Sequence, residues 1–313
     1  MNKGTLILKT DQSGGQSIPL WKDYMALSKF TLSFTVVFSC VICYLLSPNV
    51  HFNIKMITFL FIAGMLVTGS ANAINQALEK DTDAVMKRTK NRPVASGRMS
   101  KEHALGFALV AGAAGVVMMW YFFNFQSALL SLISLFLYAY IYTPLKTKSS
   151  VAVLVGAFPG ALPCLIGWVA GFSEGGDNSW TGGLILFAIQ FLWQFPHFWA
   201  IAWVAHNDYS KAGFKLLPSD KGPTKNTALQ TVLYSVLMIP IGMLPFMLGG
   251  FVHGINTTVG FASFIIVLMC NLFMVLQSIR LYIEMDVKAA RRVMFSSYIY
   301  LPIVLLTLLV DKI

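Results

Sequence analysis

The feature that most constrains this chain is a succession of apolar runs, each long enough to cross a lipid bilayer. A membrane-spanning helix needs about 20 mostly apolar residues. The 313-residue sequence contains nine such runs, separated by short polar segments. We therefore predict an all-α, polytopic membrane protein with nine transmembrane helices. The predicted spans are 24–46, 55–78, 103–122, 126–143, 151–172, 181–205, 228–249, 257–279 and 294–310.

The composition supports this assignment and predicts a single membrane domain. Hydrophobic residues make up 56% of the chain and charged residues 12%, and the mean hydropathy is +0.67. These values are outside the usual range of soluble proteins. We expect residues 1–23 to form a polar cytoplasmic segment and residues 24–313 to form the membrane domain.

The positions of the basic residues predict the orientation of the chain. The net charge is +10, with 23 lysines and arginines. With a cytoplasmic N-terminus, all of these bases except Lys55 and Lys312 fall on the inner side, as the positive-inside rule requires. The net charge is thereby explained, and a nucleic-acid partner receives almost no support. The N-terminal segment lacks the apolar core of a cleaved signal and is too acidic and arginine-free for a typical mitochondrial leader, which favours a bacterial inner membrane.

Four cysteines give no sign of a disulfide framework. Cys40 and Cys43 form a C-x-x-C pattern inside the first span. A soft-metal site is one interpretation. Small residues in a buried helix are the favoured one, because no further thiol, histidine or methionine completes a site nearby.

Three oxygen-bearing side chains are spaced to share one helix face at the inner end of the second span. Asn75, Glu79 and Asp83 follow one another at intervals of four residues, whereas Asp81 points the opposite way. A solvated helix end is one explanation. However, a charge at membrane depth costs about 2.5–3.5 kcal/mol, which favours a functional role. Carboxylate and amide oxygens suit Mg²⁺, so we predict a metal site here.

Bases in the next segments would supply the binding site for an anion beside this metal. Lys87, Arg88 and Arg92 follow the acidic face, and Lys146 and Lys148 end the fourth span. Metal ions beside arginine forks are how proteins hold a diphosphate. For the two lysines of the fourth span, ordinary anchoring at the inner surface is an equally good explanation.

The third inner loop adds one acid. Asp208 lies in "HNDYSKAGFKLLP". By itself it would be a surface acid, but opposite the first cluster it would complete the metal shell.

Several ordered blocks resemble the UbiA superfamily of intramembrane prenyltransferases, and within it the branch that farnesylates protohaem. The superfamily pattern N-x-x-x-D/E-x-x-x-D stands here as Asn75, Glu79 and Asp83. Further similar blocks are "DTDAVMKRTKNRPVASGRMS", "YTPLKTK", "GAFPGALPCLIGW" and "QFPHFWAIAW". The resemblance runs from about residue 24 to the C-terminus. Three departures are Glu79 in place of a common aspartate, "LSKFT" where relatives commonly have Lys-Pro-Arg, and a second acidic motif reduced to Asp208.

The resemblance implies a fold and a reaction. The nine helices would surround a central cavity open to the cytoplasmic side. With Mg²⁺ as cofactor, the enzyme would transfer a farnesyl group from farnesyl diphosphate to a vinyl group of haem B, and water would capture the resulting cation. The expected catalytic residues are Asn75, Glu79, Asp83, Lys146 and Asp208. Besides the lipid bilayer, a haem A synthase or oxidase assembly proteins are candidate partners.

One histidine lies deep in a predicted span. His197 would contact the haem iron, since neutral imidazole suits iron. Trp193 lies one turn earlier on the same face and would stack on the porphyrin. The alternative is a histidine that hydrogen-bonds to a neighbouring helix.

Three other functions remain open from the residues alone. The first is a prenyltransferase with another acceptor, namely an aromatic acid, a quinone precursor or chlorophyll. The second, a transporter, is disfavoured because the charges are confined to one membrane face rather than placed near the midplane. The third, a non-catalytic oxidase assembly factor that uses Cys40 and Cys43, is remote.

Overall fold

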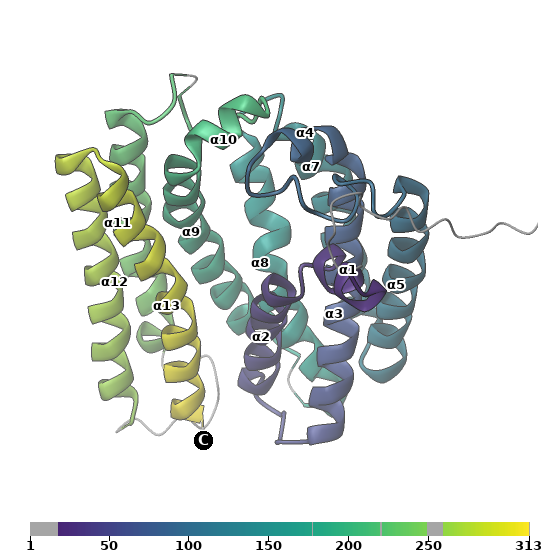
Figure 1. Ribbon diagram of the computed structural model, residues 1–313. Helices are drawn as coiled ribbons and strands as arrows, with labels where there is room; N and C mark the ends of the chain where they lie inside the picture. Colours follow the sequence, from purple (N-terminus) through teal and green to yellow (C-terminus); the bar gives the residue numbers. More distant parts are fainter. Residues whose placement is uncertain (1–17, 177, 220, 249–258, 313) are drawn as a thin grey trace, which may run out of the picture.

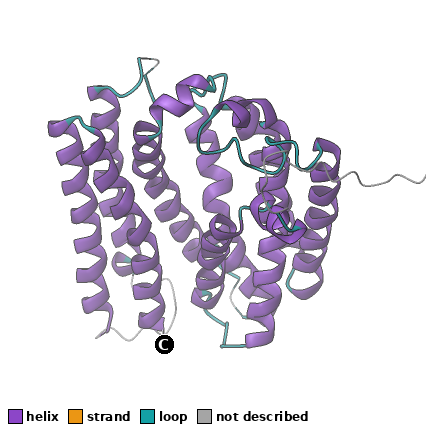
Figure 2. Ribbon diagram, viewed as in Figure 1, coloured by secondary structure: helices purple, strands orange, loops and turns teal. Residues whose placement is uncertain are grey.

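The computed structural model describes residues 18–176, 178–219, 221–248 and 259–312 (Figure 1), and within them every regular element is a helix (Figure 2). Eight helices are long and apolar enough to cross a membrane, and a bent pair of helices makes a ninth span. Each predicted span has a counterpart, so the predicted all-α, nine-span fold is confirmed. In chain order the spans are α1–α2 (Leu20–Leu27 and Phe30–Leu46), α3 (Ile54–Leu78), α5 (Lys101–Phe122), α6–α7 (Phe125–Leu145), α8 with a terminal 3₁₀ turn (Ala152–Glu174), α9 (Thr181–Val204), α11 (Lys225–Met247), α12 (Val259–Glu284) and α13 (Val287–Lys312).

Polar capping residues determine where several spans begin. The side chain of Ser100 accepts a hydrogen bond from the His103 amide at 3.1 Å, and that of Asn124 accepts one from the Ser127 amide at 2.8 Å. Such caps satisfy amides that have no partner inside the helix. The helices therefore start at these polar residues, one or two positions before the apolar runs from which the spans were predicted.

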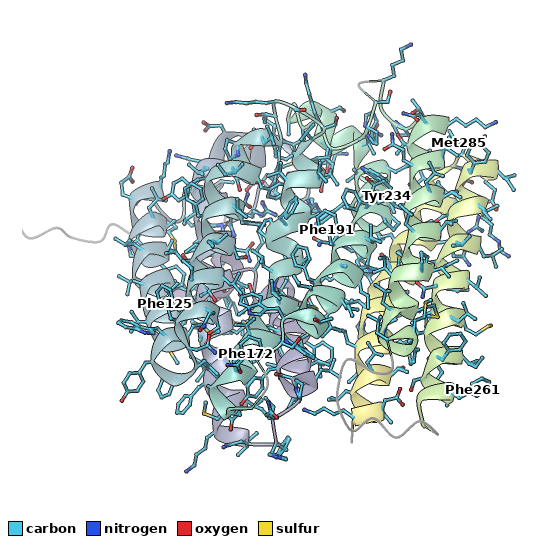
Figure 3. The ribbon with its side chains drawn as sticks, turned by 180° about the vertical axis from the view of Figure 1, so that it is seen from behind. Phe125, Phe172, Phe191, Tyr234, Phe261 and Met285 are labelled. Carbon is cyan, nitrogen blue, oxygen red and sulfur yellow. The ribbon has the colours of Figure 1, made fainter. Side chains whose placement is uncertain are left out.

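Large apolar side chains cover the outside of the bundle. Phe125 is 62% exposed and Phe261 is 70% exposed, and both lie at the outer surface (Figure 3). An outward-facing apolar surface of this extent requires a lipid environment. The chain is therefore a multi-pass membrane protein.

The first span bends sharply between α1 and α2. The two helices meet at 49°, although no proline stands at the break. Lys29 takes a left-handed backbone conformation there, with φ +47° and ψ +55°. A lysine in this conformation is strained and persists only where its surroundings hold it. The span bends even without the Lys-Pro-Arg sequence common in relatives.

Side-chain amides of α3 hold this bend. Gln76 donates from Nε2 to the carbonyls of Ala26 and Leu27, at 2.8 and 2.9 Å. Asn72 donates from Nδ2 to the Ser28 carbonyl at 3.2 Å. Carbonyls at a helix break inside a bilayer must find a partner within the protein. The polar residues of α3 supply it, which fixes the start of α2 against the C-terminal half of α3.

The central helix α8 lies between two groups of helices and is buried along most of its length. It packs against α2, α6 and α9, with α3 and α5 to one side and α11, α12 and α13 to the other (Figure 1). Pro163 lacks an amide hydrogen, so the Pro159 carbonyl has no helical partner. Ser134 donates to that carbonyl at 3.2 Å. Cys40 and Cys43 of α2 are part of the same core, at 4% and 0% exposure.

Short helices gather at one end of the bundle. These are α4 (Lys80–Val85), α7 (Thr143–Leu145) and α10 (His206–Lys211). We call this end of the molecule the loop end. It lies opposite the end of α13 that carries the C-terminus (Figure 1). The loop end therefore brings together the polar segments that follow α3, α6 and α9.

Candidate active site

Asn75, Glu79 and Asp83 share one buried face at the loop end. The chain changes helix here, from α3 to α4, but the α-helical spacing continues. The Glu79 amide donates to the Asn75 carbonyl at 2.9 Å, and the Asp83 amide donates to the Glu79 carbonyl at 2.7 Å. The three residues are 0%, 7% and 0% exposed, whereas Asp81 is exposed. We call these three residues the acidic face.

A lysine contacts each of the first two members of the acidic face. Lys29 donates from Nζ to Asn75 Oδ1 at 2.7 Å, and Lys146 Nζ lies 2.9 Å from Glu79 Oε1. Burial lowers the pKa of Lys146, but the Glu79 carboxylate together with nearby Tyr138 and Tyr209 outweighs this effect, so the pKa is raised above its ordinary value. Lys146 is therefore a permanent cation beside Glu79.

Arg92 neutralises the third member. Its NH1 donates to both carboxylate oxygens of Asp83, at 2.8 and 2.7 Å. Thr89 donates to the Asp83 backbone carbonyl at 2.8 Å and so ties the loop to α4. A fully buried carboxylate is tolerated because it is paired in this way. The predicted proximity of the acidic face and the arginine loop is therefore present in the structure.

The acidic face has the donor set of a hard-metal site. Glu79 Oε1 is buried and has no hydrogen-bond partner among the described residues. The Lys146–Glu79 contact is therefore an ion pair that lacks hydrogen-bond alignment. Carboxylate and amide oxygens with unused lone pairs fit Mg²⁺.

Asp208 does not join this donor set. Among the described residues, no three His, Cys, Asp or Glu side chains lie close enough to share one metal ion. The four-residue metal shell expected from the sequence is therefore not formed in this structure. The Asp208 carboxylate, half-buried on α10, contacts no cation in the described part of the chain.

The segment around Asp208 contributes aromatic rings instead of a carboxylate. Arg88 donates from NH2 to the Tyr209 hydroxyl at 3.2 Å, and its guanidinium lies 5.9 Å from the centroid of that ring. Lys146 Nζ lies 5.8 Å from the Phe214 ring and 4.6 Å from the Tyr142 ring. These separations are those of cation–π contacts. The sequence did not predict a site role for these rings or for Lys29. Their position next to the polar motifs was the only signal for them in the sequence.

Two predicted diphosphate ligands are separate from the acidic face. The side chains of Lys87 and Lys148 are exposed and make no hydrogen bond or ion pair with the described residues. Solvated lysines at the membrane surface fit the anchoring role that the sequence also allowed.

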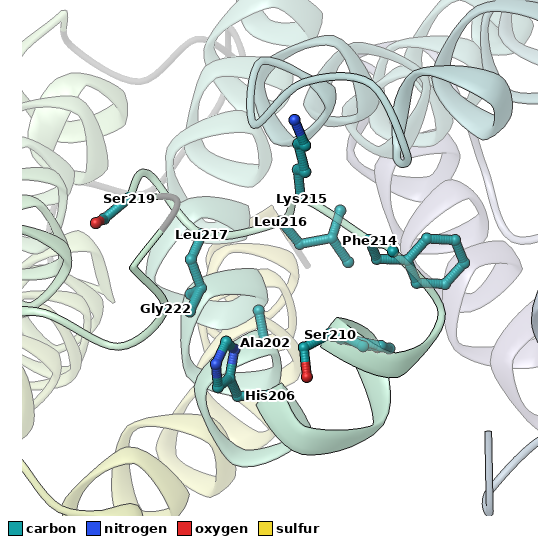
Figure 4. A pocket seen from close by; sticks show the side chains of 11 residues that line it. Ala202, His206, Ser210, Phe214, Lys215, Leu216, Leu217, Ser219 and Gly222 are labelled. Carbon is teal, nitrogen blue, oxygen red and sulfur yellow. The ribbon is translucent and has the colours of Figure 1, made fainter. Parts of the chain in front are cut away.

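A cavity of about 280 Å³ opens between α10 and the segment that follows it (Figure 4). Its lining includes His206, Tyr209, Phe214 and Lys215. The Lys215 amide donates to the Lys146 carbonyl at 2.7 Å, which joins the cavity wall to the charged site. The cavity therefore borders the residues that contact Arg88 and Lys146.

His197 and Trp193 share a face of α9, as the helical spacing predicts. Their rings stack with centroids 4.6 Å apart and planes inclined by 20°. His197 Nδ1 lies 2.8 Å from Ser297 Oγ on α13, and Trp193 donates from Nε1 to the Ser297 carbonyl at 2.9 Å. His197 Nδ1 therefore bonds to a neighbouring helix, as the helix-packing alternative predicted, whereas no such bond involves Nε2 among the described residues.

Known proteins with similar sequences show the family to which this chain belongs. The sequence matches the UbiA prenyltransferase family over residues 36–299. The chain belongs to the UbiA prenyltransferase family. It is 43% identical over 290 residues to the protoheme IX farnesyltransferase of Cytophaga hutchinsonii, an alignment that covers 93% of this chain and 97% of that protein. It is 42% identical over 295 residues to the protoheme IX farnesyltransferase of Flavobacterium johnsoniae, covering 94% and 95%.

Solved structures of other UbiA proteins share the fold. A digeranylgeranylglyceryl phosphate synthase superposes with a TM-score of 0.74 at 21% identity, covering 93% of this chain and 98% of its own. A UbiA homologue from Archaeoglobus fulgidus bound to GPP and Mg²⁺ superposes with a TM-score of 0.66 at 12% identity, covering 91% and 99%. The helical arrangement found here is thus that of the UbiA family.

Proposed function

We propose that this UbiA-family chain transfers a farnesyl group from farnesyl diphosphate to a vinyl group of haem B and forms haem O. The observation that supports the prenyl-transfer part is the acidic face at the loop end, with Arg92, Lys146 and Lys29 in contact with it. The identity of the acceptor is supported by relatives named protoheme IX farnesyltransferase at 43% and 42% identity over nearly the whole chain. No other acceptor class has comparable support.

Asn75, Glu79 and Asp83 would hold Mg²⁺, with Asp208 as a candidate fourth ligand that would have to approach from α10. When bound, the metal would neutralise negative charge on the diphosphate oxygens. In the present structure Lys146 and Arg92 neutralise Glu79 and Asp83. A metal diphosphate brings both signs of charge, so the acids could turn to the metal and the bases to the phosphate oxygens. No buried charge would be left unpaired in this exchange.

Arg88, Arg92 and Lys146 would bind the diphosphate and stabilise the charge that develops when the C1–O bond breaks. The exposed Lys87 and Lys148 would assist at the entrance. The farnesyl tail would lie among the apolar helices. The allylic cation left behind needs electron-rich faces, and Tyr142, Phe214 and Tyr209 already lie within 6 Å of the Lys146 or Arg88 cations.

His197 and Trp193 would bind the acceptor, with the imidazole on the haem iron and the indole beside the porphyrin. A vinyl carbon would attack the allylic cation. The resulting porphyrin-stabilised cation would take up hydroxide from water, and the water proton would pass to solvent. This sequence yields a hydroxyethylfarnesyl side chain.

The decisive experiment measures the product. Purified protein in nanodiscs is incubated with haem B, farnesyl diphosphate and Mg²⁺, and the porphyrins are analysed by mass spectrometry. We expect haem B to gain one farnesyl group and one hydroxyl group. A parallel incubation with a hydroxybenzoate should leave that acceptor unchanged. Prenylated hydroxybenzoate with unmodified haem would overturn the proposed acceptor and keep the enzyme class.

Arginine geometry gives a further prediction. Arg88→Ala and Arg92→Ala should each raise the KM for farnesyl diphosphate by about tenfold or more, the effect of losing a charged hydrogen bond. Lysine at either position should recover only part of the loss, because a point charge cannot reproduce the guanidinium fork. Steady-state kinetics at saturating haem measures this, with Lys90→Ala, an exposed base of the same loop, as control. Full recovery with lysine at both positions would show that the two arginines act only as membrane-surface charges.

The orientation of the chain can be tested with reporter fusions. We propose a bacterial inner membrane, an N-terminus in the cytoplasm and a loop end that opens to the cytoplasm, where haem O would pass to a haem A synthase or oxidase assembly proteins. Fusions after residues 100, 148 and 222 should report a cytoplasmic location, and a fusion near residue 176 an external one. The opposite pattern would place the acidic face outside the cell.

A further inference from the structure

We propose that Ser297 is a positioning residue that holds His197 as the Nδ1-protonated tautomer, so that the Nε2 lone pair is available to the acceptor. The availability to the acceptor rests on the proposed function. The tautomer itself is inferred from one hydrogen bond within α13 and one contact between α9 and α13.

A short chain of hydrogen bonds determines which ring nitrogen carries the proton. The Ser297 hydroxyl donates to the Met294 backbone carbonyl at 2.6 Å. A serine hydroxyl has one hydrogen, and we place it in this bond, which is the shorter of the two contacts of Ser297 Oγ. Ser297 Oγ then accepts from His197 Nδ1, which lies 2.8 Å away. In a neutral imidazole the proton is then on Nδ1, and Nε2 keeps a lone pair.

Two further contacts fix the direction of the ring. The stacked Trp193 indole covers one face of the imidazole, and its Nε1 donates to the backbone carbonyl of the same Ser297 at 2.9 Å. The Tyr298 ring meets the imidazole edge to face, with centroids 5.3 Å apart. Ser297 and Tyr298 therefore hold the His197 ring in one orientation, and Ser297 also holds the Trp193 indole. This is how a residue outside the reacting atoms prepares a ligand for its partner.

The second ring nitrogen is free within the described part of the chain. His197 Nε2 makes no hydrogen bond or ion pair there, and the side chain is only partly buried. Tyr298, which packs against His197, is 46% exposed. Nε2 with a lone pair can bind iron, whereas Nε2–H cannot. The bond to Ser297 thereby decides whether His197 can act as a ligand.

The tautomer can be read directly without any substrate. Full-length protein labelled with ¹⁵N-histidine is studied by NMR in nanodiscs, and the His197 signals are assigned by their loss in His197→Gln. We expect a protonated-type Nδ1 and a lone-pair-type Nε2. Ser297→Ala should shift the population towards Nε2–H, whereas Ser297→Thr, which keeps a hydroxyl, should retain the original tautomer. Ser296→Ala, a buried neighbour on α13, should leave the spectrum unchanged.

A wild-type spectrum with Nε2–H would overturn the inference without reference to any variant, and so would an unchanged tautomer in folded Ser297→Ala. The consequence for the acceptor is measured by haem B titration of the Soret band. Ser297→Ala should weaken haem binding by about tenfold, the effect of losing a hydrogen bond behind a ligand, with an unchanged KM for farnesyl diphosphate. The predicted tautomer without haem binding would contradict the proposed acceptor only. Haem O formation with the other tautomer would contradict the role of Ser297 only.

Discussion

Replacing Asp83 with alanine is expected to abolish prenyl transfer, with a fall in kcat/KM of about a thousandfold, the upper range for losing one preorganised electrostatic group. Asp83 is fully buried and binds Arg92 through both carboxylate oxygens. Its removal would take away one proposed metal ligand and leave the guanidinium without its partner. Charge stabilisation and diphosphate orientation would thus fail together.

The control for this prediction lies two residues away. Asp81 is exposed on the opposite side of α4, so Asp81→Ala should keep near wild-type activity and Mg²⁺ dependence. Breaking a buried ion pair also destabilises a protein, by about 3–5 kcal/mol. Asp83→Asn is therefore compared as well, because it keeps the shape and an acceptor oxygen. Size-exclusion profiles verify folding, and turnover is measured over a Mg²⁺ titration and with chelator. Near-normal activity of folded Asp83→Ala would show that the acidic face has no catalytic role and is only a neutralised helix end.

The second large effect is expected in the packing of α2 against α8. Gly167→Ala should destabilise the folded protein by about 3 kcal/mol or more, at the upper end for an overpacked core. A Cβ at this position would lie 1.9 Å from the Cys40 carbonyl oxygen and 3.0 Å from the Tyr44 amide nitrogen. Both are backbone atoms, so no side-chain rotation relieves the clash, and the two helices would have to separate.

Gly106→Ala is the matched substitution. Gly106 lies in α5, where an added Cβ meets no atom within 4 Å. Alanine there should be neutral or stabilising by up to about 1 kcal/mol, because it favours the helix. Unfolding in increasing SDS, followed by circular dichroism, measures both variants. Equal midpoints for Gly167→Ala and wild type would show that α2 and α8 do not approach each other as closely as in this structure.

Interactions along one helix were predictable from the sequence. The spacing of Asn75, Glu79 and Asp83 depends only on the helical repeat, so their shared face was visible in the linear pattern, and so was the outward direction of Asp81. The stacking of Trp193 on His197 follows from the same repeat. The nine spans were predictable because the bilayer sets a minimum length for an apolar helix.

The partners of these residues were not predictable, because they come from other helices. Lys29 reaches Asn75 because the first span bends, although no proline marks the bend in the sequence. The bend is stabilised by Gln76 and Asn72, which donate hydrogen bonds to its carbonyls. Asp208, expected as a metal ligand, forms no three-residue metal group with Glu79 and Asp83 among the described residues. The rings of Tyr209 and Phe214 from the same segment contact Arg88 and Lys146 instead, and no single-helix pattern contains these contacts.

The sequence by itself therefore determined the membrane class, the number of spans and the acidic face, because bilayer thickness and helical periodicity act on consecutive residues. Only the tertiary structure decided which cation pairs with which acid, which rings surround Lys146 and Arg88, and which nitrogen of His197 remains available. These choices depend on how helices distant in the chain pack at the loop end. There, buried polar side chains such as Asn75 and Gln76 bond to other segments of the chain, since the bilayer offers no partner.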